Sequence, residues 1–208
     1  DRRITEALFE EIMGLWQTDE LRSTRPTPQD EVEHGLYYLS SVLYHALPDV
    51  LQVFQGEVER VYGRRLELAP MIRFGSWIGG DKDGNANVTH QTLRWALTRY
   101  RQAVLSKYLD SFEQLSERLT HSDQLCRMHP SFLRSLAHDR QSFPALVDAL
   151  DQRYPHQPYR QKLTIMTHRL RQMVRHPSPN DGYDSVEDLQ RDLRLMRRSL
   201  IGHRADPI

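Results

Sequence analysis

Most of the chain repeats apolar residues at every third or fourth position, which is the period of an amphipathic helix. The segments that show this pattern are 4–15, 32–43, 51–61, 93–119, 130–137, 143–153, 157–175 and 186–201. Between them lie short polar connections, of which the Pro- and Asn-containing stretch at 176–184 is the clearest break. The pattern therefore predicts a mainly α fold.

Prolines, a glycine and a threonine indicate where the first helices begin and end. Pro26 and Pro28 separate the first helix from the second, and Pro48 is expected to start a third helix that Gly63 ends. Thr89 is a suitable N-cap for the longest helix, because its hydroxyl can accept a hydrogen bond from the first turn.

One segment departs from the helical period and predicts a single strand. At about 71–78 apolar residues alternate with small or polar ones, and a glycine-rich loop follows directly. A lone strand has no partner for its backbone hydrogen bonds, so it should belong to a sheet that the rest of the chain does not obviously supply. The chain is then a single fragment, 1–208, with helices in 1–63, the strand and loop in 70–88, and a helical region in 89–208.

Composition and charge narrow the class of protein. The 208 residues carry 28 basic and 28 acidic side chains. The charge is distributed nearly evenly along the chain, because residues 1–120 hold 14 basic and 18 acidic side chains and residues 121–208 hold 14 basic and 10 acidic ones. Binding to duplex DNA needs a denser field of positive charge. No apolar run reaches the roughly 18 residues of a membrane span, and the N-terminus lacks the apolar stretch of a secretory signal. We expect a cytoplasmic protein that binds neither nucleic acid nor membrane.

The single cysteine, Cys126, rules out an internal disulfide and a thiolate zinc cluster. The glycine-rich loop at 79–85 also fails two standard motifs. Asn85 and Ala86 replace the Lys-Ser/Thr of a phosphate-binding P-loop. A calcium loop would need glycine at Ala86 and glutamate at Thr92. Residue chemistry alone leaves two interpretations: a tight turn whose charges cap one another and the next helix, or a loop that binds an anion.

A longer match favours a functional loop. Residues 73–89 read R-F-G-S-W-I-G-G-D-K-D-G-N-A-N-V-T. Two further matches to the same family occur in the expected order: residues 18–22 with 25–31 lie upstream of this stretch, and residues 158–160 lie downstream of it. Together they resemble phosphoenolpyruvate carboxylase of the bacterial type, whose usual signature is R-F-x-S-W-M-G-G-D-R-D-G-N-P-x-V-T. The missing initial Met and the abrupt end at Ile208 are expected cut sites of an internal fragment from the N-terminal half.

The resemblance implies an enzyme that joins phosphoenolpyruvate and bicarbonate with Mg²⁺ or Mn²⁺, giving oxaloacetate and phosphate, and that assembles as a homotetramer. It implies a TIM-type barrel surrounded by helices, in which 71–78 is the second barrel strand and the loop lies at its C-terminal end. Trp77 would line the substrate pocket against the methylene carbon, although a core aromatic is the other interpretation. The implied active-site loop consists of Gly79, Gly80, Asp81, Lys82, Asp83, Gly84 and Asn85.

Two arginines match positions that bind a sugar-phosphate activator in plant members of the family. Arg22 and Arg160 are therefore possible effector-binding residues, while pairing with local carboxylates is the alternative. The loop departs from the family at Lys82, which replaces the usual arginine, and at Ala86, which replaces the usual proline. Lys82 cannot make the planar bidentate contact of an arginine, and Ala86 leaves the turn less rigid.

Several family motifs have no match in the chain. Neither the T-A-H-P-T stretch with the catalytic histidine nor the F-H-G-R-G-G loop is found, and no segment resembles the metal-binding acidic regions. We therefore expect the isolated chain to be inactive, with catalytic residues and metal ligands in the remainder of the polypeptide. The alternative is a stand-alone helical interaction or effector-binding domain derived from the family.

Overall fold

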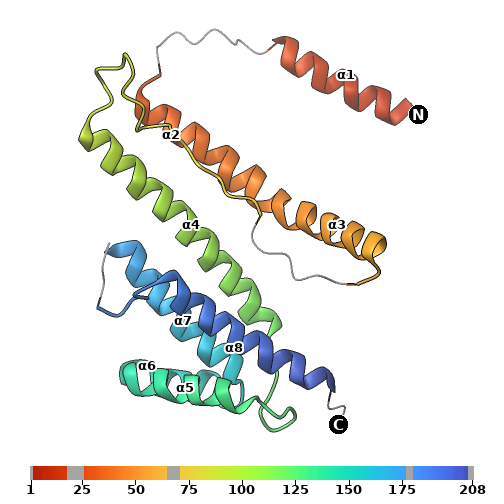
Figure 1. Ribbon diagram of the computed structural model, residues 1–208, viewed down its shortest axis with the longest axis vertical. Coiled ribbons are helices and arrows are strands. Elements are labelled where there is room, and N and C mark those ends of the chain that lie inside the picture. The colour runs from red at the N-terminus through yellow and green to blue at the C-terminus, as the bar shows by residue number, and fades with distance from the viewer. Residues whose placement is uncertain (1, 18–25, 65–70, 177–179, 206–208) are drawn as a thin grey trace. The chain divides into compact units, whose positions relative to one another are not determined.

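The computed structural model describes residues 2–17, 26–64, 71–176 and 180–205, and every regular element in that part of the chain is a helix (Figure 1). The helices are α1 (Arg2–Gln17), α2 (Pro28–Tyr37), η1 (Tyr38–Leu43), α3 (Tyr44–Tyr62), α4 (His90–Arg118), α5 (Pro130–Ser142), α6 (Pro144–Arg153), α7 (Pro158–Arg175) and α8 (Val186–Ala205). The prediction of a mainly α fold is confirmed. None of the described helices has the length and apolar character needed to cross a membrane.

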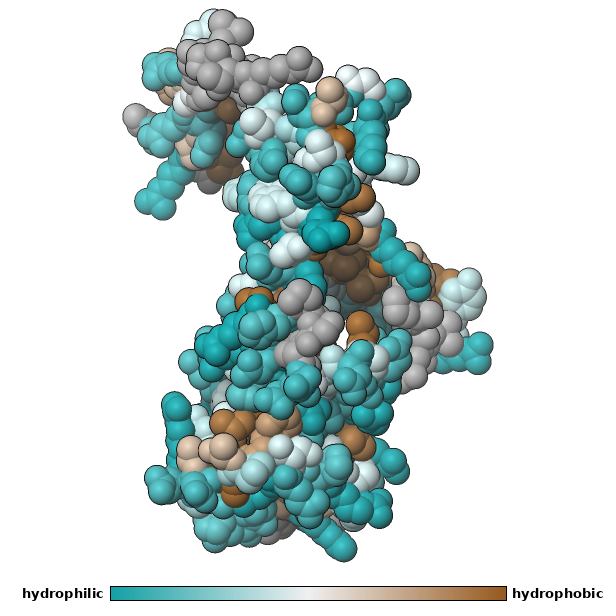
Figure 2. Space-filling model, turned by 90° about the vertical axis from the view of Figure 1, so that its left-hand side faces the viewer, coloured by the Kyte–Doolittle hydropathy of each residue, from teal (hydrophilic) through white to brown (hydrophobic). Residues whose placement is uncertain are grey.

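The chain forms two compact units, one of Asp1–Gly35 with Pro70–Ala96 and the other of Leu36–Ala69 with Leu97–Ile208. In the second unit α7 is the central helix. Its buried apolar side chains meet those of α4, α5 and α8 in a core of Leu105, Phe112, Met128, Phe132, Tyr159, Leu163, Met166, Leu170, Tyr183 and Met196. A smaller cluster of Leu136, Leu150 and Ile165 joins α5, α6 and α7. On the face shown in Figure 2, hydrophilic side chains predominate and apolar ones form separate patches.

The first unit has a much smaller core. Val32 of α2 and Ala96 of α4 are fully buried, and Val88, just before α4, is nearly so. Gly79 of the glycine-rich loop lies against Val32 and Ala96, so the loop rests on the second turns of α2 and α4.

The predicted strand at 71–78 is wrong for this chain. Residues 71–77 have no regular secondary structure, and a turn begins at Ile78. Within the described residues the backbone of 71–75 forms no backbone–backbone hydrogen bond. A strand is defined by such bonds to a neighbour. The described helices use their own backbone groups internally, so no partner is available among the described residues.

The predicted helix start at Pro48 is also wrong, because Pro48 lies inside α3. Proline removes one hydrogen bond and crowds the carbonyl four residues earlier, which here belongs to Tyr44. The chain distorts at this place and does not break: the π-helical segment η1 ends directly before Tyr44, whose N–H bonds to the Leu39 carbonyl. Gly63 ends α3 as predicted, with a φ of 65° and its N–H bonded to the Glu59 carbonyl.

Candidate active-site loop and a buried charge network

The loop at 79–85 is held against α2 and α4 at a position where only glycine fits. Gly79 has a φ of +80°, and a Cβ atom added there would lie 2.7 Å from the Ala96 Cβ and 2.8 Å from the Val32 Cγ2. Both the backbone conformation and the close approach therefore exclude a side chain.

A tight turn fixes the backbone of Trp77 and leaves its indole in solvent. The Trp77 carbonyl accepts hydrogen bonds from the N–H groups of Gly80 and Asp81, both at 3.0 Å. The Trp77 side chain is 83% exposed. The indole thus does not pack in a core within the described part of the chain. Trp77 lies two residues before Gly79, whose position is fixed by α2 and α4.

Two polar side chains shape the rest of the loop. Asp81 accepts a hydrogen bond from the Asp83 N–H at 3.1 Å, and Asn85 accepts one from the Asn87 N–H at 3.0 Å. These are side-chain turns of the kind that Asp and Asn favour. Asp81, Lys82 and Asp83 are exposed, so the loop presents two carboxylates and one ammonium to its surroundings.

The loop ends in a reciprocal cap on α4. The Thr92 N–H donates to the Thr89 hydroxyl at 3.3 Å, and the Thr89 N–H donates to the Thr92 hydroxyl at 3.2 Å. The predicted N-cap role of Thr89 is confirmed, and the pair has the geometry of a capping box with threonine in place of the usual Glu or Gln. Because the Thr92 N–H bonds to the cap, it is not available to bind an anion.

Of the two possible effector-binding arginines, the structure describes only Arg160. Arg22 lies outside the described residues. Arg160, near the start of α7, donates to the Ser116 carbonyl at 2.7 Å and to the Glu117 carbonyl at 3.4 Å. Its guanidinium also lies 5.3 Å from the ring centre of Tyr154. Arg160 thus binds the last carbonyl groups of α4, where a cation is favourable.

Comparison with known families identifies the family of the chain. A family model described as phosphoenolpyruvate carboxylase matches residues 1–208, the whole chain. The chain belongs to the phosphoenolpyruvate carboxylase family.

Individual relatives agree with the family match. The chain is 36% identical over 214 residues to the phosphoenolpyruvate carboxylase of Roseiflexus castenholzii, covering 97% of the chain and 23% of that protein. It is 35% identical to the phosphoenolpyruvate carboxylase of Synechocystis sp., covering 93% and 20%, and 34% identical to that of Xanthomonas campestris pv. campestris, covering 91% and 21%. The chain thus spans about a fifth of the length of the curated relatives it matches.

The structure also reveals a buried ionic cluster that sequence reasoning missed. Lys162 of α7 is fully buried. Its ammonium donates to the Asp139 carboxylate of α5 at 2.5 Å, to the Asp192 carboxylate of α8 at 2.6 Å and to the Ser135 hydroxyl at 2.9 Å. All three N–H donors of the lysine are satisfied, and one side chain thereby joins three helices.

Arg169 adds a second cation to this cluster. Its guanidinium lies 3.1 Å from one Asp139 oxygen and 3.9 Å from one Asp192 oxygen, and stacks at 5.0 Å on the rings of Phe143 and Tyr183. The Tyr183 hydroxyl donates to Asp192 at 2.9 Å. Burial, and then the Asp192 carboxylate, raise the pKa of Tyr183, which keeps the hydroxyl protonated as a donor. Two cations and two carboxylates leave this ionic cluster neutral.

The signal for the ionic cluster is present in the sequence but ambiguous. Lys162 lies between Tyr159 and Met166 on the apolar side of its helix, and Asp192 lies between Leu189 and Met196 on the apolar side of its own. A charged residue in an apolar stripe indicates burial with a partner. Helical periodicity does not tell which helix supplies that partner.

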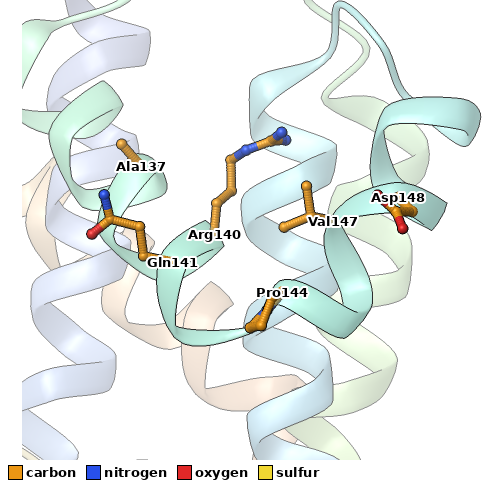
Figure 3. A pocket seen from close by; sticks show the side chains of 6 residues that line it. All are labelled: Ala137, Arg140, Gln141, Pro144, Val147 and Asp148. Atoms are coloured by element: carbon orange, nitrogen blue, oxygen red, sulfur yellow. The ribbon is translucent and has the colours of Figure 1, made fainter.

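A hollow of about 560 Å³ lies where α5 turns into α6, lined by Ala137, Arg140, Gln141, Pro144, Val147 and Asp148 (Figure 3). The Arg140 guanidinium donates two hydrogen bonds to the Asp151 carboxylate, both at 2.7 Å, and one to the Gln161 side-chain oxygen at 3.1 Å. The hydrogen bond from Arg140 lowers the pKa of the Asp151 carboxyl. The arginine thus links α5, α6 and α7, and the geometry indicates a structural role.

The described residues do not fit a divalent metal. No three histidine, cysteine, aspartate or glutamate side chains in this part of the chain converge on one point. The carboxylates of Asp81 and Asp83 are the nearest approach to such a set within the loop, and Asp81 already accepts a backbone hydrogen bond.

Proposed function

We propose that this chain is part of an enzyme that carboxylates phosphoenolpyruvate with bicarbonate, giving oxaloacetate and phosphate. The family match over the whole chain carries the proposal, and the signature at 73–89 supports it. The catalytic groups then lie in the remainder of the polypeptide, in a cytoplasmic enzyme that is expected to be a homotetramer.

Trp77 is proposed to form one wall of the phosphoenolpyruvate pocket. Its backbone is held by the two hydrogen bonds to its carbonyl, and its indole is exposed in this chain. A flat apolar ring beside the methylene carbon would keep water from protonating the enolate. Residues 79–85 are proposed to form the active-site loop, with Gly79 fixing its position.

Residues 71–78 are proposed to complete a sheet of a TIM-type barrel in the full enzyme. Their apolar side chains are well exposed, with Met71 at 51% and Phe74 at 51%. The backbone of 71–75 has no partner among the described residues. Adjacent strands would satisfy these backbone groups, and a loop at a strand's C-terminal end is where barrel enzymes place their chemistry.

The family's divalent metal would polarise substrate oxygens, but the described residues lack a suitable ligand set, so its ligands are proposed to lie in the remainder of the polypeptide. An anionic effector at Arg22 and Arg160 also stays a proposal. At Arg160 it would have to displace the Ser116 and Glu117 carbonyls that the guanidinium now binds.

The isolated 208-residue chain is expected to be inactive. Without the catalytic histidine and the arginine-glycine loop of the family, neither carboxyphosphate formation nor enolate capture has its charged groups. The measurement is bicarbonate-dependent phosphate release from phosphoenolpyruvate, with the full-length protein as the positive control. Clear turnover by the isolated chain would refute the proposal that the catalytic residues lie in the remainder of the polypeptide.

In the full-length protein, Trp77→Ala is expected to lower kcat/KM for phosphoenolpyruvate roughly 10- to 100-fold, because an apolar wall of the pocket is lost. Trp77→Phe keeps a flat apolar ring and should retain most of the activity. Steady-state kinetics on the two variants check the prediction. Unchanged kcat and KM in Trp77→Ala would remove Trp77 from the pocket.

A further inference from the structure

The N-terminal helix α1 presents a broad apolar face. Its large apolar residues share one side of the helix: Ile4, Leu8, Phe9, Ile12, Leu15 and Trp16. Each of them is between 53% and 84% exposed. Among the α1 residues whose exposure is described, only Met13 is even partly buried. Within the described part of the chain this face is therefore uncovered.

A helix of this kind needs a surface to cover it. Helices of 16 residues are only marginally stable in water without tertiary packing. Soluble proteins also rarely expose a contiguous patch of large apolar side chains unless it is an interaction site. The described residues leave that patch open, so a covering surface is expected outside them.

We propose that the apolar face of α1 docks onto the remaining polypeptide of a full-length phosphoenolpyruvate carboxylase, on an apolar surface with a basic rim. The chain covers only 23% and 20% of its first two relatives, so about four-fifths of such a polypeptide lies outside it and can supply this surface. The inference rests on the proposed function, because it places the chain inside the full-length enzyme.

The charged residues in the sequence of α1 distinguish this occupant from two others. Glu6, Glu10 and Glu11 outnumber Arg2 and Arg3 on this helix. Helices that lie on membrane surfaces carry mostly lysine and arginine on their polar side, so an anionic lipid surface is disfavoured. A second copy of α1 would bring the same acidic residues together, whereas a basic rim on the remaining polypeptide would complement them.

Cysteine labelling tests the proposal. Leu8→Cys lies on the apolar face and Glu10→Cys on the opposite side of the same helix. Each variant is reacted with a maleimide, both in the isolated chain and in the full-length polypeptide encoded by the gene that carries this chain. Labelling is read by peptide mass spectrometry, with the half-buried Cys126 as an internal reference for folding.

Leu8→Cys is expected to react at least tenfold more slowly in the full-length protein than in the isolated chain, while Glu10→Cys reacts at similar rates in both. Ile4→Cys, on the same face, repeats the measurement should Leu8→Cys disturb the full-length fold. Equal labelling of the apolar-face cysteines in both samples would overturn the proposal, as would a gene that encodes nothing beyond these residues.

The other occupants give different results. Protection that rises with the concentration of the isolated chain would identify a second copy, and protection only on adding anionic vesicles would identify a membrane; either would overturn the proposal. Carboxylation is assayed on the same samples. Protected Leu8→Cys without carboxylation would refute the proposed function alone, and carboxylation with unprotected cysteines would refute the docking alone.

Discussion

Replacing Lys162 with methionine is expected to lower the free energy of unfolding of the second unit, Leu36–Ala69 with Leu97–Ile208, by about 3–5 kcal/mol. This is the usual cost of breaking a buried ion pair by removing one partner. The methionine fills a similar volume but leaves the buried Asp139 and Asp192 carboxylates with Arg169 as the one remaining cation near them among the described residues. Urea denaturation followed by circular dichroism at 222 nm, a wavelength that reports helix content, measures the change.

Two comparisons separate the effect of leaving two buried carboxylates without their lysine from the effect of a lysine-to-methionine change as such. Lys82→Met replaces an exposed lysine and should change the free energy of unfolding by less than about 0.5 kcal/mol. Adding Asp139→Asn and Asp192→Asn to Lys162→Met removes the uncompensated carboxylates and should recover part of the loss. A loss below about 1 kcal/mol in Lys162→Met would contradict the buried cluster described above.

The second large effect is expected at Gly79. Gly79→Ala should destabilise the loop by about 2–5 kcal/mol, because a left-handed φ costs an L-residue about 1–2 kcal/mol and crowding a packed site costs about 1–3 kcal/mol more. The added Cβ would meet Ala96 and Val32, which are both fully buried and cannot move aside easily. Hydrogen exchange of the Val88 and Thr92 amides reports the free energy of local opening.

Two other glycines provide matched controls. Gly84 has a φ of +67° but open space around its would-be Cβ, so Gly84→Ala should cost only the conformational part, about 1–2 kcal/mol. Gly75 has neither a positive φ nor a neighbour within 4 Å, so Gly75→Ala should change little. If Gly79→Ala behaved like Gly84→Ala, the close approach to α2 and α4 would not limit the loop.

The sequence predicted best where a local physical cause decides the structure. The 3.6-residue period located the helices, Gly63 ended α3 through its left-handed backbone, and Thr89 capped α4 through its hydroxyl. At Pro48 the local rule was overridden, because a π-helical segment directly upstream accommodates the proline within α3. The strand prediction at 71–78 depended on a partner that the described residues do not provide.

The sequence by itself thus determined most of the helices, the end of α3 at Gly63 and the cap of α4 at Thr89, because these depend on neighbours a few residues apart. Only the tertiary structure decided that Gly79 touches Val32 and Ala96 and that Lys162 joins Asp139 and Asp192. Those contacts link residues between about 17 and 47 positions apart, and helical periodicity carries no information about which helices pack together. The tertiary structure also showed that the described residues do not cover the apolar face of α1 or residues 71–78, since burial depends on the whole set of available surfaces.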